Sequence, residues 1–364
     1  LVVDGSQSSS TNVVHDLVTD FVSGEDYAAY LRVVNQTGGT IRPRASGDGF
    51  TNAGDSSTAS RHIMRRFTAG GDYPQFGMVL SSDFAGEVLE AQAYPLQARL
   101  DGPLDIYILA GQSNMVGASG VTGFDLDLDL PEVRALAVSG FAAPVQGYET
   151  DGTGPSIHAG LSADHGIGYP MPMCHPVVHA SSNTGGVSPA GYIAQRIAEA
   201  GTAPGRTPVF VCAAAGGTDL FTDWNPADDG RYHALMVANV AALLARNGSN
   251  AVAGMVWCQG ESSGASGYAA LLSGLVGDLR ASWGAFPVVV MEHGGSRGNT
   301  TFDNMRAEQL KLATGSGAAE ELSLCAYVDR PGSAALEGDG IHYTASTNRQ
   351  RGIDAGNALL ALTS

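Results

Sequence analysis

From about residue 105 to the end of the chain, short apolar runs alternate with longer segments whose apolar residues recur every three or four positions. The short runs are typical of buried strands, and the longer segments are typical of helices with one buried face. We predict strands at residues 105–110, 132–138, 208–215, 251–259, 287–292 and 322–329, and helices at 189–200, 237–246, 268–282 and 352–362. This alternation indicates an α/β fold in which helices cover both faces of a mostly parallel sheet.

The first hundred residues have a different pattern. Their apolar runs, at residues 27–34, 76–80 and 87–93, are short and are separated by Gly, Ser, Asn and Asp. Such a pattern predicts strands and turns, with one short helix near residues 13–22. We therefore expect a small β-rich N-terminal appendage at residues 1–102 and an α/β domain at residues 103–364, with the seam within residues 97–103.

Residues 147–186 form a long segment rich in Gly, Pro, Ser and His, without a strand or helix pattern. Segments of this length inside a compact domain usually have a function, and this one could wall or cover a site. Its histidines have spacings that match no standard zinc site, so we expect them to face substrate or solvent. They are His158, His165, His175 and His179.

Two other polar features, an alternating run of Asp residues and His293, do not by themselves indicate a site. Asp125, Asp127 and Asp129 alternate with apolar residues but lack the Gly and the distal Glu of a calcium loop, which favours a half-exposed strand or turn. His293 follows a predicted strand and could line a pocket or cap a helix.

Charge and composition exclude some partners. The 36 acidic and 19 basic residues give a net charge of −17, which argues against nucleic acid or an anionic membrane surface as a partner. No apolar window reaches the roughly 18 residues that a membrane-spanning helix needs. The chain begins at Leu1 without Met or a basic leader, so its compartment stays open, with an extracellular, periplasmic or particle-associated location favoured over the cytoplasm.

Cysteine usage indicates buried thiols. Cys212, Cys258 and Cys325 lie in apolar runs that resemble strands, and Cys174 lies in the long segment described above. No pair has the spacing of a zinc site, and we expect thiols in preference to disulfides.

Candidate chemistry is concentrated in strings that follow predicted strands. Ser113 lies in the string Gly111-Gln112-Ser113-Asn114-Met115, just after the strand at residues 105–110. A glycine there allows a tight turn that presents the serine at the edge of the sheet, where neighbouring amides can face a substrate oxygen. The alternative is a serine that caps a helix.

Three further strings supply an acid–base pair and hydrogen-bond donors. Asp339 and His342 are spaced so that one turn of backbone brings the carboxylate against the imidazole; the alternative is an Asp that caps a helix. Trp257-Cys258-Gln259-Gly260-Glu261 offers an amide donor and a carboxylate, or is a strand–helix loop capped by Ser262. Gly216 and Gly217 can present backbone N–H groups, or form a simple turn.

The order of Ser113, Gly216-Gly217, Gln259, Asp339 and His342 resembles the SGNH (GDSL-type) hydrolase superfamily. It is most similar to the branch of sialate O-acetylesterases and carbohydrate esterase family 6. Strings that mark this branch are Gly-Gln-Ser-Asn-Met, Gly-Gly-Thr, Trp-x-Gln-Gly-Glu and Asp-x-x-His, found here at residues 111–115, 216–218, 257–261 and 339–342. The resemblance covers residues 104–361, and the first and third strings together are specific. The wider superfamily has Asn where this chain and the branch have Gln259.

The resemblance implies a fold and roles for these residues. The fold would be a three-layer α/β/α sandwich with a flavodoxin-like layout. Ser113 would be the nucleophile, His342 the base and Asp339 its orienting partner. The oxyanion hole would comprise the amides of Ser113 and of Gly216 or Gly217, with the side chain of Gln259. Supporting residues would be Gln112, Asn114 and Glu261, and no metal or organic cofactor is expected.

The leading functional hypothesis is a serine esterase that removes acetyl or other short acyl groups from carbohydrates. One alternative enzyme class is a broader lipase or thioesterase, which would need an apolar acyl channel that the sequence does not indicate. Another class is a catalytically silent glycan-binding adhesin or a spike attached to a particle. An intact set of Ser113, Asp339 and His342 favours activity, whereas the unassigned N-terminal region favours attachment to a larger assembly.

Overall fold

The computed structural model describes residues 2–4, 11–23, 26–45, 61–68, 73–95, 102–117, 136–139, 170–172, 187–201, 204–330 and 335–363. These residues divide into two compact units, with the boundary between residues 101 and 102. Several expectations concern residues outside this set: the four clustered histidines, the Asp residues at 125–129, Cys174, and all of the segment 147–186 except residues 170–172.

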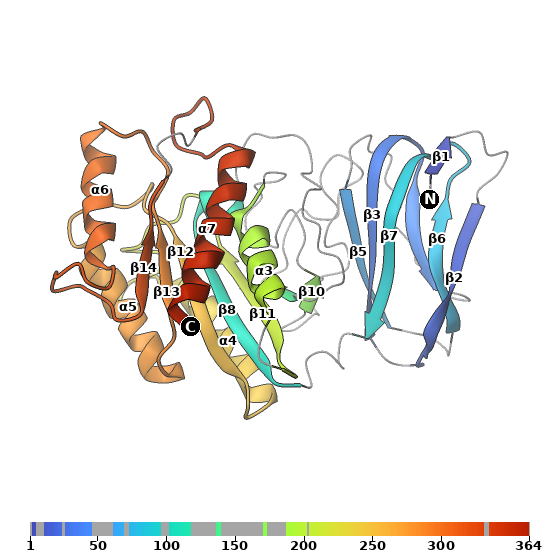
Figure 1. The fold of residues 1–364 in the computed structure, drawn as a ribbon, viewed down its shortest axis with the longest axis horizontal. Helices are drawn as coiled ribbons and strands as arrows, with labels where there is room; N and C mark the ends of the chain where they lie inside the picture. The colour runs from blue at the N-terminus through green and yellow to red at the C-terminus, as the bar shows by residue number, and fades with distance from the viewer. Residues whose placement is uncertain are drawn as a thin grey trace. The chain divides into compact units, whose positions relative to one another are not determined.

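The N-terminal unit is a sandwich of two antiparallel sheets (Figure 1). One sheet has the order β1 (Val2–Asp4), β7 (Ala85–Pro95), β3 (Asp26–Gly38) and β5 (Arg61–Thr68), and the other has the order β2 (Thr11–Phe21), β6 (Tyr73–Leu80) and β4 (Ile41–Ala45). Buried side chains from both sheets share one core, among them Leu31, Val33, Phe76 and Leu80. The expected β-rich appendage is therefore present.

The short helix predicted near residues 13–22 is wrong, because these residues form most of β2. The segment is rich in Val, whose branched side chain favours a strand, and β6 supplies a pairing partner over most of its length. Phe21 at the end of the strand is buried in the core of the sandwich.

The second unit contains a seven-stranded sheet. Its order is β10 (Pro170–Pro172), β9 (Leu136–Ser139), β11 (Thr207–Ala214), β8 (Leu104–Gly111), β12 (Ala251–Cys258), β13 (Val288–Met291) and β14 (Cys325–Val328). All neighbouring pairs are parallel except β9 and β10. The central strands are buried on both faces, as their continuous apolar runs predict.

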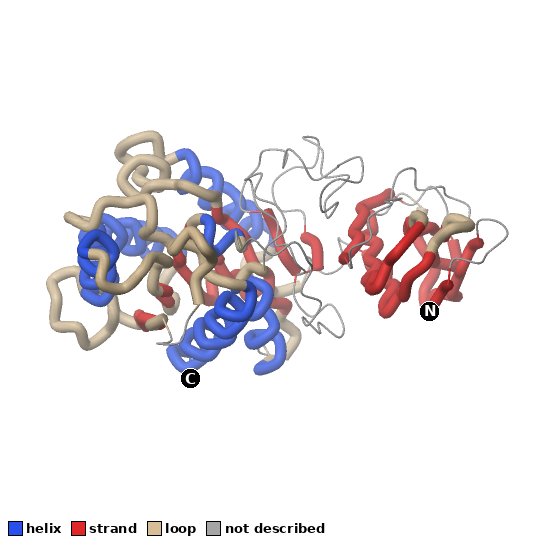
Figure 2. The backbone as a smooth tube through the Cα atoms, turned by 90° about the horizontal axis from the view of Figure 1, so that it is seen from above, coloured by secondary structure: helices blue, strands red, loops and turns tan. Residues whose placement is uncertain are grey.

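Helices cover both faces of this sheet (Figures 1 and 2). Helices α3 (Pro189–Ala200) and α7 (Ala345–Thr363) lie on one face, and α4 (Arg231–Arg246) and α5 (Tyr268–Trp283) lie on the other. The sheet and its two helical layers form the three-layer sandwich that the resemblance implies, so the predicted fold class is confirmed. None of the helices within the described residues is both long and apolar enough to cross a bilayer.

The second unit differs from the sequence-based prediction in several details. Helix α7 begins at Ala345, seven residues before the predicted start, and β10 lies in the segment where no strand was expected. Helix α4 begins at Arg231, six residues before the predicted start. Helix α6 (Thr300–Lys311) was not predicted, because it is polar at most positions and buries only Met305 and Gln309. The thiols of Cys212, Cys258 and Cys325 are buried, as expected.

Helices α3 and α7 approach each other closely at Gly352. A Cβ atom there would lie 2.4 Å from the carbonyl oxygen of Pro189 and 2.8 Å from the Cβ of Tyr192. Gly277, in the exposed face of α5, has open space around the same position. The two glycines therefore provide a matched pair of helix-interior positions with opposite environments.

We predict opposite effects for alanine at these two positions. Gly277→Ala should raise the free energy of unfolding by about 0.5–1 kcal/mol, because alanine loses less backbone entropy on folding and meets no neighbour. Gly352→Ala should lower it, because α3 and α7 must separate to admit the methyl group. Urea unfolding of both variants checks this, and equal effects at the two sites would contradict the close approach.

Candidate active site

The predicted strings meet at one edge of the parallel sheet because three neighbouring strands end there in register. Gly111 at the end of β8 pairs with Ala214 of β11 on one side and with Cys258 of β12 on the other. The segments that follow these strands therefore begin side by side, at the carboxyl edge where ligands bind in open α/β sheets.

Gly111 makes the turn into the nucleophile string possible. Its φ angle is 143°, and a Cβ atom there would lie 2.0 Å from the carbonyl oxygen of Cys258. That oxygen instead accepts the backbone N–H of Gln112 at 3.0 Å. Ser113 is the first residue of the four-residue helix α2 (Ser113–Val116), whose N-cap is Gln112, so Ser113 is not the cap itself.

Ser113, His342 and Asp339 form a continuous chain of hydrogen bonds. The Ser113 Oγ lies 2.9 Å from the His342 Nε2, and the His342 Nδ1 lies 2.5 Å from the Asp339 Oδ2. Ser113 is 5% exposed, His342 is part-buried and Asp339 is exposed. Asp339 and His342 lie far from Ser113 in the sequence. They come close to it because the loop before α7 returns to this edge of the sheet (Figure 1).

The Asp339 carboxylate also orders the loop that carries His342. Its Oδ1 accepts the backbone N–H groups of Ile341 at 2.9 Å and His342 at 3.0 Å. Burial would raise the pKa of Asp339, but these two amides and the imidazole outweigh it and lower the pKa to about 2. The carboxylate is therefore ionised at neutral pH and faces one imidazole nitrogen while the other faces Ser113.

Asn114 links the nucleophile turn to the histidine loop. Its Nδ2 donates to Glu261 Oε1 at 2.6 Å and to the Ile341 carbonyl at 3.3 Å, and its Oδ1 accepts the N–H of Tyr343 at 3.0 Å. Glu261 Oε1 also accepts the N–H of Gly294 at 2.5 Å. One amide side chain thus holds the residues on both sides of His342.

Gln259 is fully buried beneath this edge. Its Nε2 lies within hydrogen-bond distance of three acceptors: Gln112 Oε1 at 3.0 Å, the Thr218 carbonyl at 3.0 Å and Ser263 Oγ at 2.7 Å. The amide therefore connects the nucleophile string to the string that contains the two glycines. Its role as an oxyanion donor stays a prediction.

Backbone N–H groups are available beside Ser113. Gly216 and Gly217 follow β11, and Gly217 is exposed with a φ of 73°, a conformation that favours glycine. Within the described part of the chain, no group accepts the N–H of Ser113, Gly216 or Gly217. Thr218 fixes this turn, since its Oγ1 donates to the Ala215 carbonyl and accepts from the Trp224 indole.

A supporting string, Glu292-His293-Gly294-Gly295, follows β13, and only its His293 was singled out from the sequence. Gly294 packs against the histidine loop so closely that a Cβ atom would lie 1.8 Å from the Ile341 carbonyl oxygen. The signal was present, because this string also places polar residues and glycines directly after a buried strand. Arg351 of α7, fully buried over the Tyr343 ring, gave no such signal.

His, Cys, Asp and Glu side chains in the described ranges form no group of three or more placed to hold a metal ion. The groups described above are a hydroxyl, an imidazole, carboxylates and amides. Together they offer a nucleophile in contact with a base, and unpaired amides beside it.

Comparisons with known proteins identify the family and the fold of this chain. The family model described as "Carbohydrate esterase, sialic acid-specific acetylesterase" matches residues 103–361. A solved protein from Arabidopsis thaliana is 20% identical, with a TM-score of 0.53 over 71% of this chain and 98% of its own. NanS is 16% identical, with a TM-score of 0.52 over 72% of this chain and 98% of its own. At these identities the two structures show a shared fold. A search of curated proteins finds no match.

The pKa of Asp339 leads to a prediction about acid stability. The pKa of this carboxyl is ordinarily 3.8 and is about 2 in the folded protein. The ionised carboxylate therefore stabilises the fold fully at pH values above 3.8, and this stabilisation is lost as the pH falls through about 2. The difference in unfolding free energy between wild type and Asp339→Asn should therefore shrink as the pH is lowered from about 5 to about 2. Urea unfolding across this range measures it, and a difference that does not vary with pH would contradict the assignment.

Proposed function

The chain belongs to the family of sialic acid-specific acetylesterases among the carbohydrate esterases, and from that premise we propose that it removes O-acetyl or other short acyl groups from carbohydrates with Ser113 as nucleophile. The observation that carries this proposal is the continuous chain of hydrogen bonds from Asp339 through His342 to Ser113. The family makes the protein a carboxylic ester hydrolase, and the residue roles below are our proposal.

The first half of the reaction forms an acyl-enzyme. Ser113 Oγ attacks the ester carbonyl carbon while His342 Nε2 accepts its proton, and Asp339 stabilises the resulting imidazolium. Negative charge develops on the carbonyl oxygen, where the amides of Ser113 and of Gly216 or Gly217, together with the Gln259 side chain, stabilise it. The C–O bond of the ester then breaks, and the sugar hydroxyl leaves with the proton held by His342.

The second half regenerates the enzyme. A water molecule gives its proton to His342 Nε2 and attacks the acyl carbon, and the bond to Ser113 Oγ breaks as the serine regains the proton. The products are a carboxylic acid and the free serine. The supporting residues Gln112, Asn114 and Glu261 hold the two loops in place throughout, since their contacts join the nucleophile turn to its neighbours.

We also propose that the two parts of the chain have different functions. All the groups invoked above lie between residues 103 and 364, which favours this part as the esterase domain. The N-terminal sandwich supplies none of them, which favours a separate role for residues 1–102, such as attachment to a larger assembly.

Replacing the nucleophile tests the proposal. Ser113→Ala should lower kcat by roughly 10³-fold or more with the fold intact, because no other group in the proposed site can form the acyl-enzyme. The measurements are nitrophenol release from p-nitrophenyl acetate, acetate release from O-acetylated glycans, and covalent labelling by a fluorophosphonate. Ser282→Ala, at an exposed position of α5, is the matched control and should keep both activity and label. Labelling of Ser113→Ala at another serine would refute the assignment.

Replacing Gln259 tests the oxyanion donors. Gln259→Ala should lower kcat on the order of 10²-fold, the usual effect of losing one donor, because the bond strengthens only as charge develops. KM should change little. Steady-state kinetics on an acetyl ester separate the two constants, and an unchanged kcat with a raised KM would instead make Gln259 a contact of the bound substrate.

A further inference from the structure

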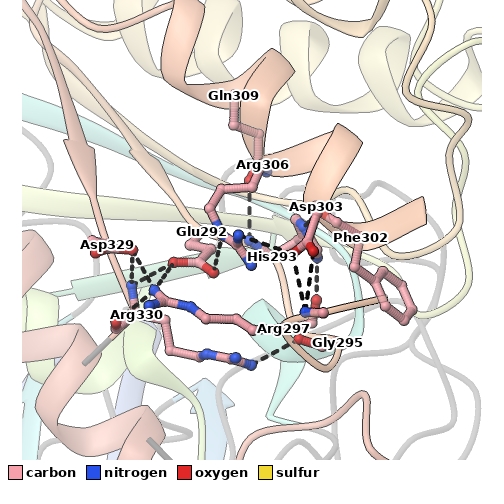
Figure 3. A network of polar contacts seen from close by, with 12 residues as sticks. Glu292, His293, Gly295, Arg297, Phe302, Asp303, Arg306, Gln309, Asp329 and Arg330 are labelled. Carbon is pink, nitrogen blue, oxygen red and sulfur yellow. Dashed lines mark hydrogen bonds and ion pairs between the residues drawn. The ribbon is translucent and has the colours of Figure 1, made fainter. Parts of the chain in front are cut away.

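Glu292, at the carboxyl end of β13, is a fully buried carboxylate surrounded by arginines (Figure 3). Its Oε1 accepts from Arg306 Nε at 2.8 Å, and its Oε2 accepts from Arg297 Nη2 at 3.0 Å and from the backbone N–H of Arg330 at 2.7 Å. Burial would raise the pKa of Glu292, but the hydrogen bonds from the Arg306 and Arg297 side chains and from the Arg330 backbone outweigh it and lower the pKa well below its usual range. A buried charge is retained only where such contacts compensate it.

The arginines in turn fix the segment that follows Glu292. Arg297 Nη2 also donates to Asp329 Oδ1 at 2.7 Å and to the Arg330 carbonyl at 3.0 Å. Arg330 Nη1 donates to the Gly295 carbonyl at 2.7 Å. Residues 292–297 are therefore tied at both ends to the last residue of β14 and the two residues after it, since the Glu292 N–H also donates to the Val328 carbonyl (Figure 3).

The same segment supports the loop that carries His342. The His293 carbonyl accepts the Tyr343 hydroxyl at 2.8 Å, and Ser296 Oγ donates to the Gly340 carbonyl at 3.4 Å. Gly294 lies directly against the Ile341 carbonyl, with no room for a side chain. Residues 340, 341 and 343 are thus each held by one residue of this segment, and His342 lies between them.

Arg351 adds a connection from the opposite side. Its Nη2 donates to the backbone carbonyl of Glu292, and its guanidinium lies 4.2 Å from the centre of the Tyr343 ring. The residue after His342 is therefore clamped between α7 and the segment that Glu292 anchors.

We propose that Glu292 is a positioning residue: by anchoring residues 293–297 through its arginines, it holds the His342 imidazole within reach of Ser113. This inference rests on the proposed function, because it takes His342 as the base. Without the carboxylate, Arg297 and Arg306 lose their common acceptor and the segment under the histidine loop is released. A displacement of about 1 Å at a reacting group costs up to roughly 10²-fold in rate.

The test compares two carboxylates at opposite edges of the same sheet. Glu292→Gln keeps the size of the side chain and removes its charge. Asp105→Asn, the matched control, does the same at the start of β8, where Asp105 Oδ1 accepts from Arg206 Nε at 2.6 Å. We expect Glu292→Gln to lower kcat by about 10²-fold with little change in KM, and Asp105→Asn to leave both unchanged. Thermal melts establish that both variants are folded at the assay temperature.

A proton resonance reports the geometry without turnover. The hydrogen bond between His342 Nδ1 and Asp339 should give a far-downfield proton signal, assigned by its loss in His342→Ala. We expect this signal to shift or disappear in Glu292→Gln and to persist in Asp105→Asn. The resonance still tests the positioning role of Glu292 if the wild type hydrolyses no acetyl ester. Absence of hydrolysis would refute the proposed function but not the positioning role.

A second variant covers the case in which Glu292→Gln does not fold. Arg297 is 39% exposed, so Arg297→Gln should fold, and it also unties the segment from Glu292 and Asp329. It should lower kcat as well, by less than Glu292→Gln because Arg306 remains. The inference would be overturned if the variant that folds kept full kcat and an unmoved proton resonance. It would also be overturned if Asp105→Asn lost as much kcat as that variant.

Discussion

The geometry of the site depends on the contact between β8 and β12 at Gly111. The backbones approach so closely there that the carbonyl of Cys258 occupies the place of a side chain. This contact makes the chain turn sharply at Gln112 and places Ser113 at the start of α2, directly beside the string that follows β12. Because β8 also pairs with β11 in register, the Gly216-Gly217 turn lies on its other side. One backbone contact therefore determines where three separate strings meet.

Buried charges lie directly behind this edge. Glu292 and Arg351 are fully buried, and Glu261 holds Asn114 and Gly294 with one oxygen. Burial would lower the pKa of Arg351, but Tyr343, Cys258 and Glu261 raise it, so the guanidinium stays charged. Buried ion pairs contribute little to stability compared with apolar packing, but they restrict the arrangements that a loop can adopt. Their concentration around the histidine loop fits a need for one defined geometry.

Much of the fold was predictable because buried strands and helix faces require apolar residues in recognisable patterns. Strands β8, β11 and β12 are nearly continuous apolar runs, and the strings after them were recognisable by residue type and order. Two predictions failed where the apolar pattern was weak. Helix α6 is polar at most positions, and β2 has an apolar spacing that a short helix could share. The contacts of Gln259 with Gln112 and Thr218, and of Asn114 with Glu261, come from packing between segments that are distant in the sequence. No local pattern in the sequence encodes them.

Cys258 has a consequence for the chemical durability of the protein. It comes directly before Gln259, and its carbonyl faces Gly111, yet its thiol points into the core between the sheet and its helices. Burial raises its pKa to about 12, against the opposing influence of Arg351. Thiolate, the form that reacts with oxidants and alkylating agents, is therefore almost absent at neutral pH. The proposed nucleophile Ser113 is 5% exposed and Cys258 is fully buried, so we expect electrophiles to reach the hydroxyl and not this thiol while the protein stays folded.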